Sequence, residues 1–232
     1  MTGLTLRRLV YDVWELIRDN IVDDDSIDER QIAEWIHQQR AIWVSNELNK
    51  GRYDESYIQD LGAIELEVID TGEVYSSTSS GLKLKRTSVD IPKGIEVHNA
   101  TGLVSVGPLD FMNSRFPIIN IERAKHAGNG RFNTETIYSF LRGDRVYLVA
   151  GSSNIYISSL KYVNIRGIFD NPEDVADFTD INGNAMFSWD DHDYPINRKL
   201  YTYLKGEILN VNVRTLARAT EDDVNNADND EA

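Results

Sequence analysis

The sequence contains no cysteine, so it can form neither a disulfide nor a thiolate zinc site, and it offers no cysteine nucleophile. It also lacks any apolar run of the roughly 18 residues that a membrane-spanning helix needs. The first residues show no basic segment followed by an apolar stretch and a small-residue cleavage site. We therefore expect a soluble protein that no recognisable signal directs to secretion.

Positive charge is scarce, because 24 Lys and Arg residues stand against 38 Asp and Glu residues, a formal net charge of −14. Binding of nucleic acid through phosphate neutralisation needs a cationic footprint, so this balance argues against a tight DNA-binding protein. DNA could still pass along an acidic wall without adhering, since like charges repel. With 232 residues, 41% of them hydrophobic, the composition is that of a globular chain of one domain or slightly more.

Common catalytic motifs are absent as well: the nucleophile elbow, the phosphate-binding loop, the dinucleotide-binding glycines and His-Glu-x-x-His. Residues 190–193, Asp-Asp-His-Asp, are the most metal-like cluster, but consecutive side chains cannot all face one ion, and a turn is favoured. A turn is favoured at residues 180–184 too, where a calcium-like loop has its glycine at the wrong position. His37, His98 and His126 are isolated from other candidate ligands. We predict no catalytic residue, no metal and no cofactor.

Both ends of the chain show the apolar spacing of helices. Residues 1–52 contain two amphipathic stretches across an acidic turn, which predicts a helical hairpin. The apolar positions are Leu6, Leu9, Val10, Val13, Ile17 and Ile21 in the first stretch, and Ile32, Trp35, Ile36, Ile42, Trp43, Val44 and Leu48 in the second. Ser26 and Glu29 form a capping-box pattern with Asp28 as a competing cap, and Lys50-Gly51 marks a helix end. Helical spacing returns over residues 195–220, where we expect a helix that packs on the hairpin.

Residues 53–194 show short β-type runs separated by Gly, Asn, Ser and Pro, which predicts an antiparallel β-rich insertion. The expected strands span residues 64–69, 82–86, 95–97, 103–106, 118–121, 145–149, 154–157 and 162–168, with a hairpin turn at 141–144. A short helix is expected near residues 171–178, with Pro172 at its first position. The fold class is therefore α+β, with the terminal helices meeting in a bundle. Residues 221–232 carry six acidic side chains and no basic one, and we expect a flexible acidic tail there.

Three of the four tryptophans lie in the amino-terminal hairpin, which is more than one amphipathic stripe needs for its own core. Packing accounts for some of them, and the rest suggest apolar surface left for another chain. The candidate interface residues are Trp14, Trp35, Arg40, Trp43, Tyr201 and Tyr203.

Basic residues concentrate at Lys83, Lys85, Arg86 and Lys93. This run is either the polar face of a strand or a patch that contacts an acidic partner surface or a DNA phosphate. The candidate contacts of the acidic tail are Asp222, Asp223 and Asp228.

Several segments along the chain resemble one known family. They are residues 4–12 (Leu-Thr-Leu-Arg-Arg-Leu-Val-Tyr-Asp), 24–27 (Asp-Asp-Ser-Ile), 39–41 (Gln-Arg-Ala), 84–87 (Leu-Lys-Arg-Thr), 90–93 (Asp-Ile-Pro-Lys), 193–196 (Asp-Tyr-Pro-Ile) and the Asn/Asp-rich end. The chain thereby resembles the head-to-tail connector, or ring and adaptor, proteins of tailed bacteriophages, especially those of crAss-like phages.

The resemblance implies a structural virion protein that is no enzyme and forms a homo-oligomeric ring of about twelve copies. Its partners would be the portal protein, other connector or tail proteins, and double-stranded DNA passing without sequence recognition; no membrane would be involved. It would lie at the portal vertex after synthesis in the host bacterial cytoplasm. The alternatives are a phage-associated carbohydrate-active or peptidoglycan-cleaving β domain, in which two acids would catalyse, and a nonenzymatic β-rich binding module.

Overall fold

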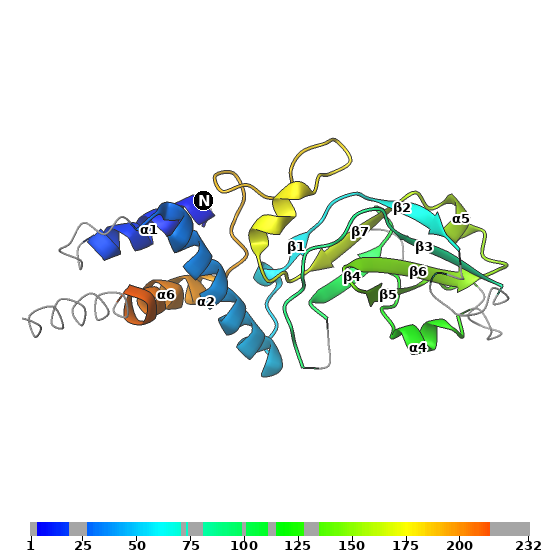
Figure 1. Ribbon diagram of the computed structural model, residues 1–232, viewed down its shortest axis with the longest axis horizontal. Helices are drawn as coiled ribbons and strands as arrows, with labels where there is room; N and C mark the ends of the chain where they lie inside the picture. The colour runs from blue at the N-terminus through cyan, green and yellow to red at the C-terminus, as the bar shows by residue number, and fades with distance from the viewer. Residues whose placement is uncertain are drawn as a thin grey trace, which may run out of the picture. The chain divides into compact units, whose positions relative to one another are not determined.

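The computed structural model describes residues 4–18, 27–70, 73, 81–98, 101–110, 115–127 and 135–213. The chain divides into two compact units. The helical unit contains residues 1–57, 170–172 and 188–232, and the sheet unit contains residues 58–169 and 173–187. Helices and an antiparallel sheet occur in the same chain, which confirms the α+β class (Figure 1).

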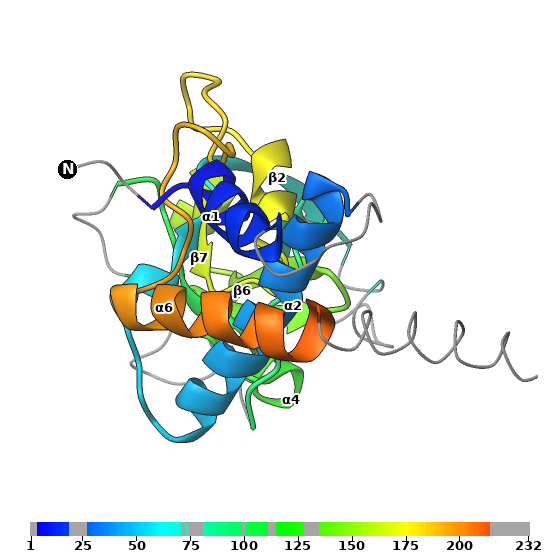
Figure 2. The ribbon, with the colours of Figure 1, turned by 90° about the vertical axis from the view of Figure 1, so that its left-hand side faces the viewer.

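The helical unit is built from α1 (Leu6–Arg18), α2 (Glu29–Asn49) and α6 (Arg198–Glu207), which a π-helical segment (Ile208–Val213) extends. α2 contacts both α1 and α6, and α6 runs across α2 (Figure 2). The predicted stripe of α1 is confirmed, because its apolar side chains are buried: Leu6, Leu9, Val10, Val13 and Ile17. The remaining predicted position, Ile21, lies outside the described residues.

The predicted end of α2 is confirmed, and the structure adds a capping residue at the start of α6. α2 ends at Asn49, after which Gly51 adopts the left-handed conformation (φ +73°) that the Lys50-Gly51 pattern predicts. α6 begins after Asn197, whose side-chain oxygen accepts a hydrogen bond from the Leu200 amide at 2.8 Å. At the start of α2, Asp28 occupies the cap position, and Ser26 lies outside the described residues.

The sheet unit holds seven strands: β1 (Gln59–Asp60), β2 (Ile64–Ile69), β3 (Leu82–Thr87), β4 (Leu103–Gly107), β5 (Tyr138–Arg142), β6 (Arg145–Gly151) and β7 (Tyr162–Gly167). All named pairs are antiparallel, in the order β1-β7-β2-β3-β6-β5, and β4 pairs with β7. The predicted hairpin at residues 141–144 is confirmed, with Gly143 (φ +60°) in the turn between β5 and β6.

A segment without a strand of its own links the two outer strands of this sheet. The Phe116 amide donates to Val106 of β4 at 2.8 Å, the Ile119 amide donates to Ser139 of β5 at 2.8 Å, and the Ser139 amide donates back to Pro117 at 2.9 Å. Residues 116–119 therefore cover the free edges of β4 and β5, so that neither edge offers a continuous row of unpaired backbone groups.

Two short helices, one on each side of the sheet, pack on the strands (Figure 1). α4 (Ile121–Ala124) covers an apolar cluster between β3, β5 and β6, whose buried members are Ile69, Leu82, Leu84, Ala124, Ala127, Phe140, Tyr147 and Val149. α5 (Tyr156–Ser159) contacts β3 and β6. The apolar core of the unit thus depends on both short helices as well as on the strands.

Four predicted elements were wrong or incomplete. Residues 154–157 lead into α5 instead of a strand, because the Asn154 side chain accepts from the Ile157 amide at 3.0 Å and starts a helical turn. Residues 118–121 make one bridge to β5 before Asn120 caps α4 in the same way. Residues 95–97 form no strand. The short helix expected near residues 171–178 is a 3₁₀ helix, Pro172–Asp177.

Candidate assembly surfaces

The predicted interface residues Trp43 and Tyr203 lie together where α2 meets α6. Their ring centres are 6.3 Å apart, and the Tyr57 ring stands edge-on to Trp43 at 6.1 Å. The ammonium group of Lys199 lies 5.9 Å from the centre of the Trp43 ring. Tyr203 is exposed and Trp43 is half-buried. The cluster therefore stabilises the α2–α6 contact and still presents an aromatic edge to the solvent.

Tyr201, also a predicted interface residue, braces α6 against α1 inside the helical unit. Its hydroxyl donates to the carboxylate of Asp12, which also accepts from the Lys205 ammonium at 3.2 Å. Burial acts to raise the pKa of Asp12, but the hydrogen bonds from Tyr201 and Lys205 outweigh it and lower this pKa. The role of Tyr201 in this structure is thus within one subunit.

Arg40 is fully buried and does not face the solvent. Its guanidinium donates to the carbonyl of Pro195 at 3.0 Å and to that of Tyr57 at 3.4 Å, and it lies 5.9 Å from the centre of the Tyr194 ring. Burial lowers the pKa of Arg40, and the negative charge of Asp170 acts in the opposite direction. Arg40 joins three segments of the chain, so we leave it out of the surface that could meet a partner.

Trp14 and Trp35 are both half-buried. The Arg18 guanidinium lies 5.1 Å from the centre of the Trp14 ring. Trp35 shares a face of α2 with Ile42, two helical turns further on, and Ile42 is 57% exposed. Ile42 is one of the apolar positions predicted for this helix, and the structure places it on the exposed face. Its seven-residue spacing from Trp35, on a helix whose core stripe is already complete without it, is the signal that could have identified this outer face.

The four residues of the predicted basic patch do not act together. Because side chains alternate along β3, Lys83 and Lys85 lie on one face and Arg86 on the other. Lys93 lies outside the strand and pairs with Glu96 at 3.2 Å. Strand geometry thus divides one basic run in the sequence into three separate environments.

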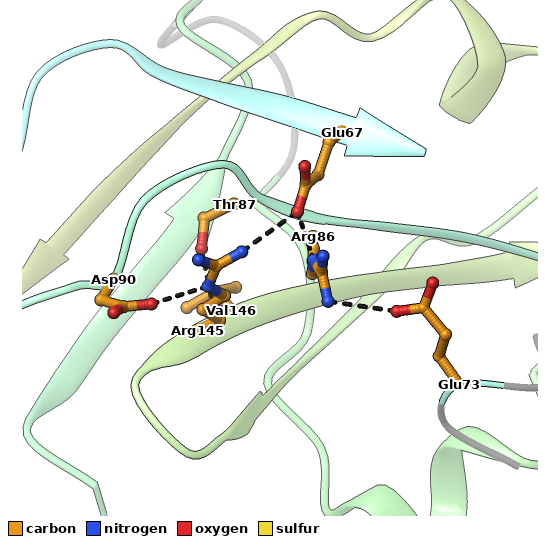
Figure 3. A network of polar contacts seen from close by, with 7 residues as sticks. All are labelled: Glu67, Glu73, Arg86, Thr87, Asp90, Arg145 and Val146. Atoms are coloured by element: carbon orange, nitrogen blue, oxygen red, sulfur yellow. Dashed lines mark hydrogen bonds and ion pairs between the residues drawn. The ribbon is translucent and has the colours of Figure 1, made fainter. Parts of the chain in front are cut away.

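Arg86 belongs to an ion-pair network that connects β2, β3 and β6 (Figure 3). Glu67 accepts from Arg86 and, at 3.1 Å, from Arg145. Arg86 reaches Glu73 at 3.2 Å, and Arg145 reaches Asp90 at 2.6 Å. These charges satisfy one another, so Arg86 is no free cation for a DNA phosphate.

Lys83 and Lys85 point instead toward the side of the sheet that α5 covers. The Lys83 ammonium donates to the Asn154 carbonyl at 2.7 Å and to the Ser158 hydroxyl at 3.1 Å. The Lys85 ammonium donates to the carbonyls of Ser158 and Leu160. Burial lowers the pKa of Lys85, because the charged form has lost part of its hydration.

The acidic clusters form turns, as predicted. Asp180 accepts hydrogen bonds from the amides and side chains of Asn182 and Asn184, which lowers its pKa to about 2. Asp190 pairs with Arg7, and Asp191 interacts with Ser188. Across the described parts of the chain, no three His, Cys, Asp or Glu side chains are placed to hold a metal ion. None of the described helices is both long and apolar enough to span a bilayer. Asp222, Asp223 and Asp228 lie outside the described residues.

Comparison with known proteins adds one finding. A family model described as phage tail ring protein 2 matches residues 8–231, which is nearly the whole chain and includes both units. No curated protein matches the sequence.

Proposed function

Because the chain belongs to the phage tail ring protein 2 family of crAss-like phages, we propose that it forms an oligomeric ring in the head-to-tail connector below the portal. The family match carries this proposal, since a tail ring protein is a structural part of the virion and a ring requires several copies of one chain. In the proposed assembly about twelve copies surround the axis, contact the portal and provide a platform for the tail. The protein is made in the host bacterial cytoplasm and ends in the virion at the portal vertex.

The charge of the chain supports the proposed passage of DNA through the ring. With a net charge of −14, a ring of many copies would carry a strongly negative field. A negative lumen repels the phosphate backbone and lets DNA slide, whereas a basic lining would retain it through counterion release. The network around Glu67 is consistent with this role, because it neutralises Arg86 and Arg145 within the subunit.

The helices supply the proposed contact between neighbouring subunits. We propose that the terminal segments, residues 1–52 and 195–220, act as one helical bundle in assembly, and that residues 53–194 reach the adjoining tail or portal components. Trp35 and Ile42 on α2 and the Trp43–Tyr203 cluster give this bundle an outward apolar surface. An exposed isoleucine on the helix face that carries Trp35 fits the apolar centre of a subunit interface better than it fits water.

Mass photometry of the purified chain, alone and mixed with the portal assembly of the same phage, tests the proposal. We expect a discrete ring-sized species in at least one of the two samples. A chain that stays monomeric and ignores the portal contradicts the connector function.

Two matched variants test the interface. Ile42→Arg changes an exposed isoleucine of the helical unit, and Ile181→Arg changes one of the sheet unit that is 64% exposed. Neither position is part of the core, so both variants should fold. We expect Ile42→Arg to abolish the ring-sized species and Ile181→Arg to retain it. The reverse pattern would place the subunit contact on the sheet unit and overturn the assignment.

A further inference from the structure

A groove of about 400 Å³ lies in the sheet unit between β2, β3 and α5. The lining residues are Val68, Ile69, Asp70, Leu82, Lys83, Leu84, Lys85, Ile157 and Ser158. It contains a pair of lysines on one strand face and an exposed apolar side chain beside them.

The two lysines are the unusual part of this groove. Lys83 and Lys85 hydrogen-bond to backbone carbonyls and to one serine hydroxyl, and within the described residues neither forms an ion pair, although Asp70 is among the lining residues. Other cations of the sheet unit do have carboxylate partners, including Arg86, Arg145, Lys93 and Lys125. Lys83 is half-buried and Lys85 is 7% exposed, and both line the groove, so two cations on one strand face, neither paired with a carboxylate among the described residues, form a local positive site.

The apolar part of the groove lies directly beside Lys85. Val68 of β2 is opposite Lys85 in the strand register and is 77% exposed. Ile157 lines the groove from α5, and its neighbours Ile155 and Tyr156 are exposed. A site with two ammonium groups and an open aliphatic wall matches a ligand that combines carboxylates with a small apolar side chain.

The carboxyl-terminal segment of the chain has this chemistry. Residues 221–232 read Glu-Asp-Asp-Val-Asn-Asn-Ala-Asp-Asn-Asp-Glu-Ala, with six acids, no base, and Val224 directly after Asp222 and Asp223. The last described residue is Val213, and Asp222, Asp223 and Val224 follow nine to eleven residues later, a distance that an extended chain spans in about 30–35 Å. That reach is about twice the radius of gyration of about 17 Å expected for a folded chain of this length, so the segment can contact a directly adjoining subunit.

We propose that the groove at Lys83 and Lys85 binds the acidic segment 221–232 of a neighbouring copy of this chain. The inference rests on the proposed ring, because assembly places each copy beside two others and raises the effective concentration of the segment. Asp222 and Asp223 pair with the two lysines, and Val224 covers Val68. Each copy then holds its neighbour by a strap that is separate from the helical contact.

Engineered cysteines test the strap cleanly, because the natural chain has no cysteine to interfere. A Val68→Cys variant is mixed with an Asn225→Cys variant that carries a size tag, and the ring-sized fraction is oxidised. A disulfide between the two variants can form only between different chains. We expect the heterodimer at a yield at least fivefold above that of a matched Ile181→Cys control.

Charge exchange then tests the chemistry. Adding Lys83→Glu to the Val68→Cys chain should lower the heterodimer yield at least fivefold, and Asp222→Lys with Asp223→Lys on the tagged chain should restore it. Lys93→Glu, at a lysine that already pairs with Glu96, should leave the yield unchanged. If Lys83→Glu disturbs folding, Asp222→Asn with Asp223→Asn on the tagged chain probes the same ion pairs from the other side.

The outcomes separate this inference from the proposed function. Ring-sized particles with equal cross-linking at positions 68 and 181, or with a yield insensitive to both charge changes, overturn the strap and leave the ring intact. If a chain that carries both cysteines forms only an intramolecular disulfide, the segment binds its own subunit, which also overturns the proposal. Loss of every ring-sized species, with and without the portal, contradicts the ring itself.

Discussion

In the helical unit a guanidinium, that of Arg40, is enclosed among the backbone carbonyls of Pro195 and Tyr57, whereas the sheet unit keeps Arg86 and Arg145 at its surface and pairs them with carboxylates. The buried guanidinium connects segments that are distant in the chain. Because it has lost its hydration, its stability depends on well-placed hydrogen bonds to these segments. The surface network connects three neighbouring strands and keeps much of its hydration. Both units bury an apolar core, and the helical unit adds an enclosed polar junction where the sheet unit adds a surface ion-pair network.

The positions of the tryptophans allow the stability of the two units to be measured separately. All four tryptophans, Trp14, Trp35, Trp43 and Trp189, belong to the helical unit. Tryptophan fluorescence thus reports on the helical unit, while the β-type circular dichroism signal reports on the sheet unit. The two signals can be followed together during urea unfolding.

The largest expected effect comes from the apolar interior of the sheet unit. Phe140 is 1% exposed and stacks on Tyr147 with ring centres 5.2 Å apart. Phe140→Ala should lower the free energy of unfolding of this unit by about 3–5 kcal/mol, because it removes buried apolar area and leaves a cavity. The circular dichroism transition should move to lower urea while the fluorescence transition stays in place. If both move together, the two units unfold as one and the comparison fails.

The next effect concerns the enclosed junction of the helical unit. Arg40→Met keeps the length of the side chain but leaves the carbonyls of Pro195 and Tyr57 without their donor. We expect a loss of about 2–4 kcal/mol in the fluorescence transition and none in the circular dichroism transition. Arg40→Lys keeps the charge but not the planar donor group, so its free energy of unfolding should lie between those of the natural protein and Arg40→Met. A more stable Arg40→Met would show that dehydration of the guanidinium costs more than its hydrogen bonds return.

Alkaline pH provides a smaller test in the same unit. Burial raises the pKa of Tyr57 to about 12, above the ordinary value near 10 for an unfolded chain. Between these values the folded chain keeps a proton that the unfolded chain releases, so the contribution of Tyr57 is complete below about pH 10 and is lost as pH rises to about 12. The fluorescence transition should weaken by about 2 kcal/mol over this interval. Tyr57→Phe, which cannot ionise, should remove this part of the loss and leave the smaller contributions of tyrosines such as Tyr201, whose pKa is also raised by burial.

Local patterns in the sequence predicted local structure well. The stripe of α1, the end of α2 and the β5–β6 hairpin each depend on residues within about two turns or one loop of one another, and all three are confirmed. The pairing of β4 with β7 and the cover that residues 116–119 give to β4 and β5 are different. They join residues tens of positions apart through backbone hydrogen bonds, which side-chain spacing does not encode.

The candidate residues were harder to place, for two physical reasons. Arg40 lies on the buried side of α2, but a charged residue in an amphipathic pattern is assigned to the surface unless its carbonyl partners, supplied by distant segments, are known. Lys83, Lys85 and Arg86 are adjacent in sequence, and strand alternation alone could have separated them. Strand alternation does not predict α5, however. Residues 154–157 were expected to form a strand, whereas the Asn154 side chain starts a helical turn.

The smallest expected effect comes from the surface network of the sheet unit. Glu67→Gln keeps the shape of the side chain but removes the charge shared by Arg86 and Arg145. Because the partners remain partly hydrated, we expect a loss below about 1 kcal/mol in the circular dichroism transition at low salt. This loss should disappear near 1 M salt, where the screening length falls to about 3 Å.

Glu65→Gln, an exposed position on the same strand, is the matched control and should change nothing at either salt concentration. If Glu67→Gln lowers the free energy of unfolding by more than Arg40→Met does, and the loss persists in 1 M salt, the ion-pair network supplies most of the stability of the sheet unit. The contrast between the enclosed junction of the helical unit and the surface network of the sheet unit would then be reversed, because the surface charges would contribute more than the enclosed guanidinium.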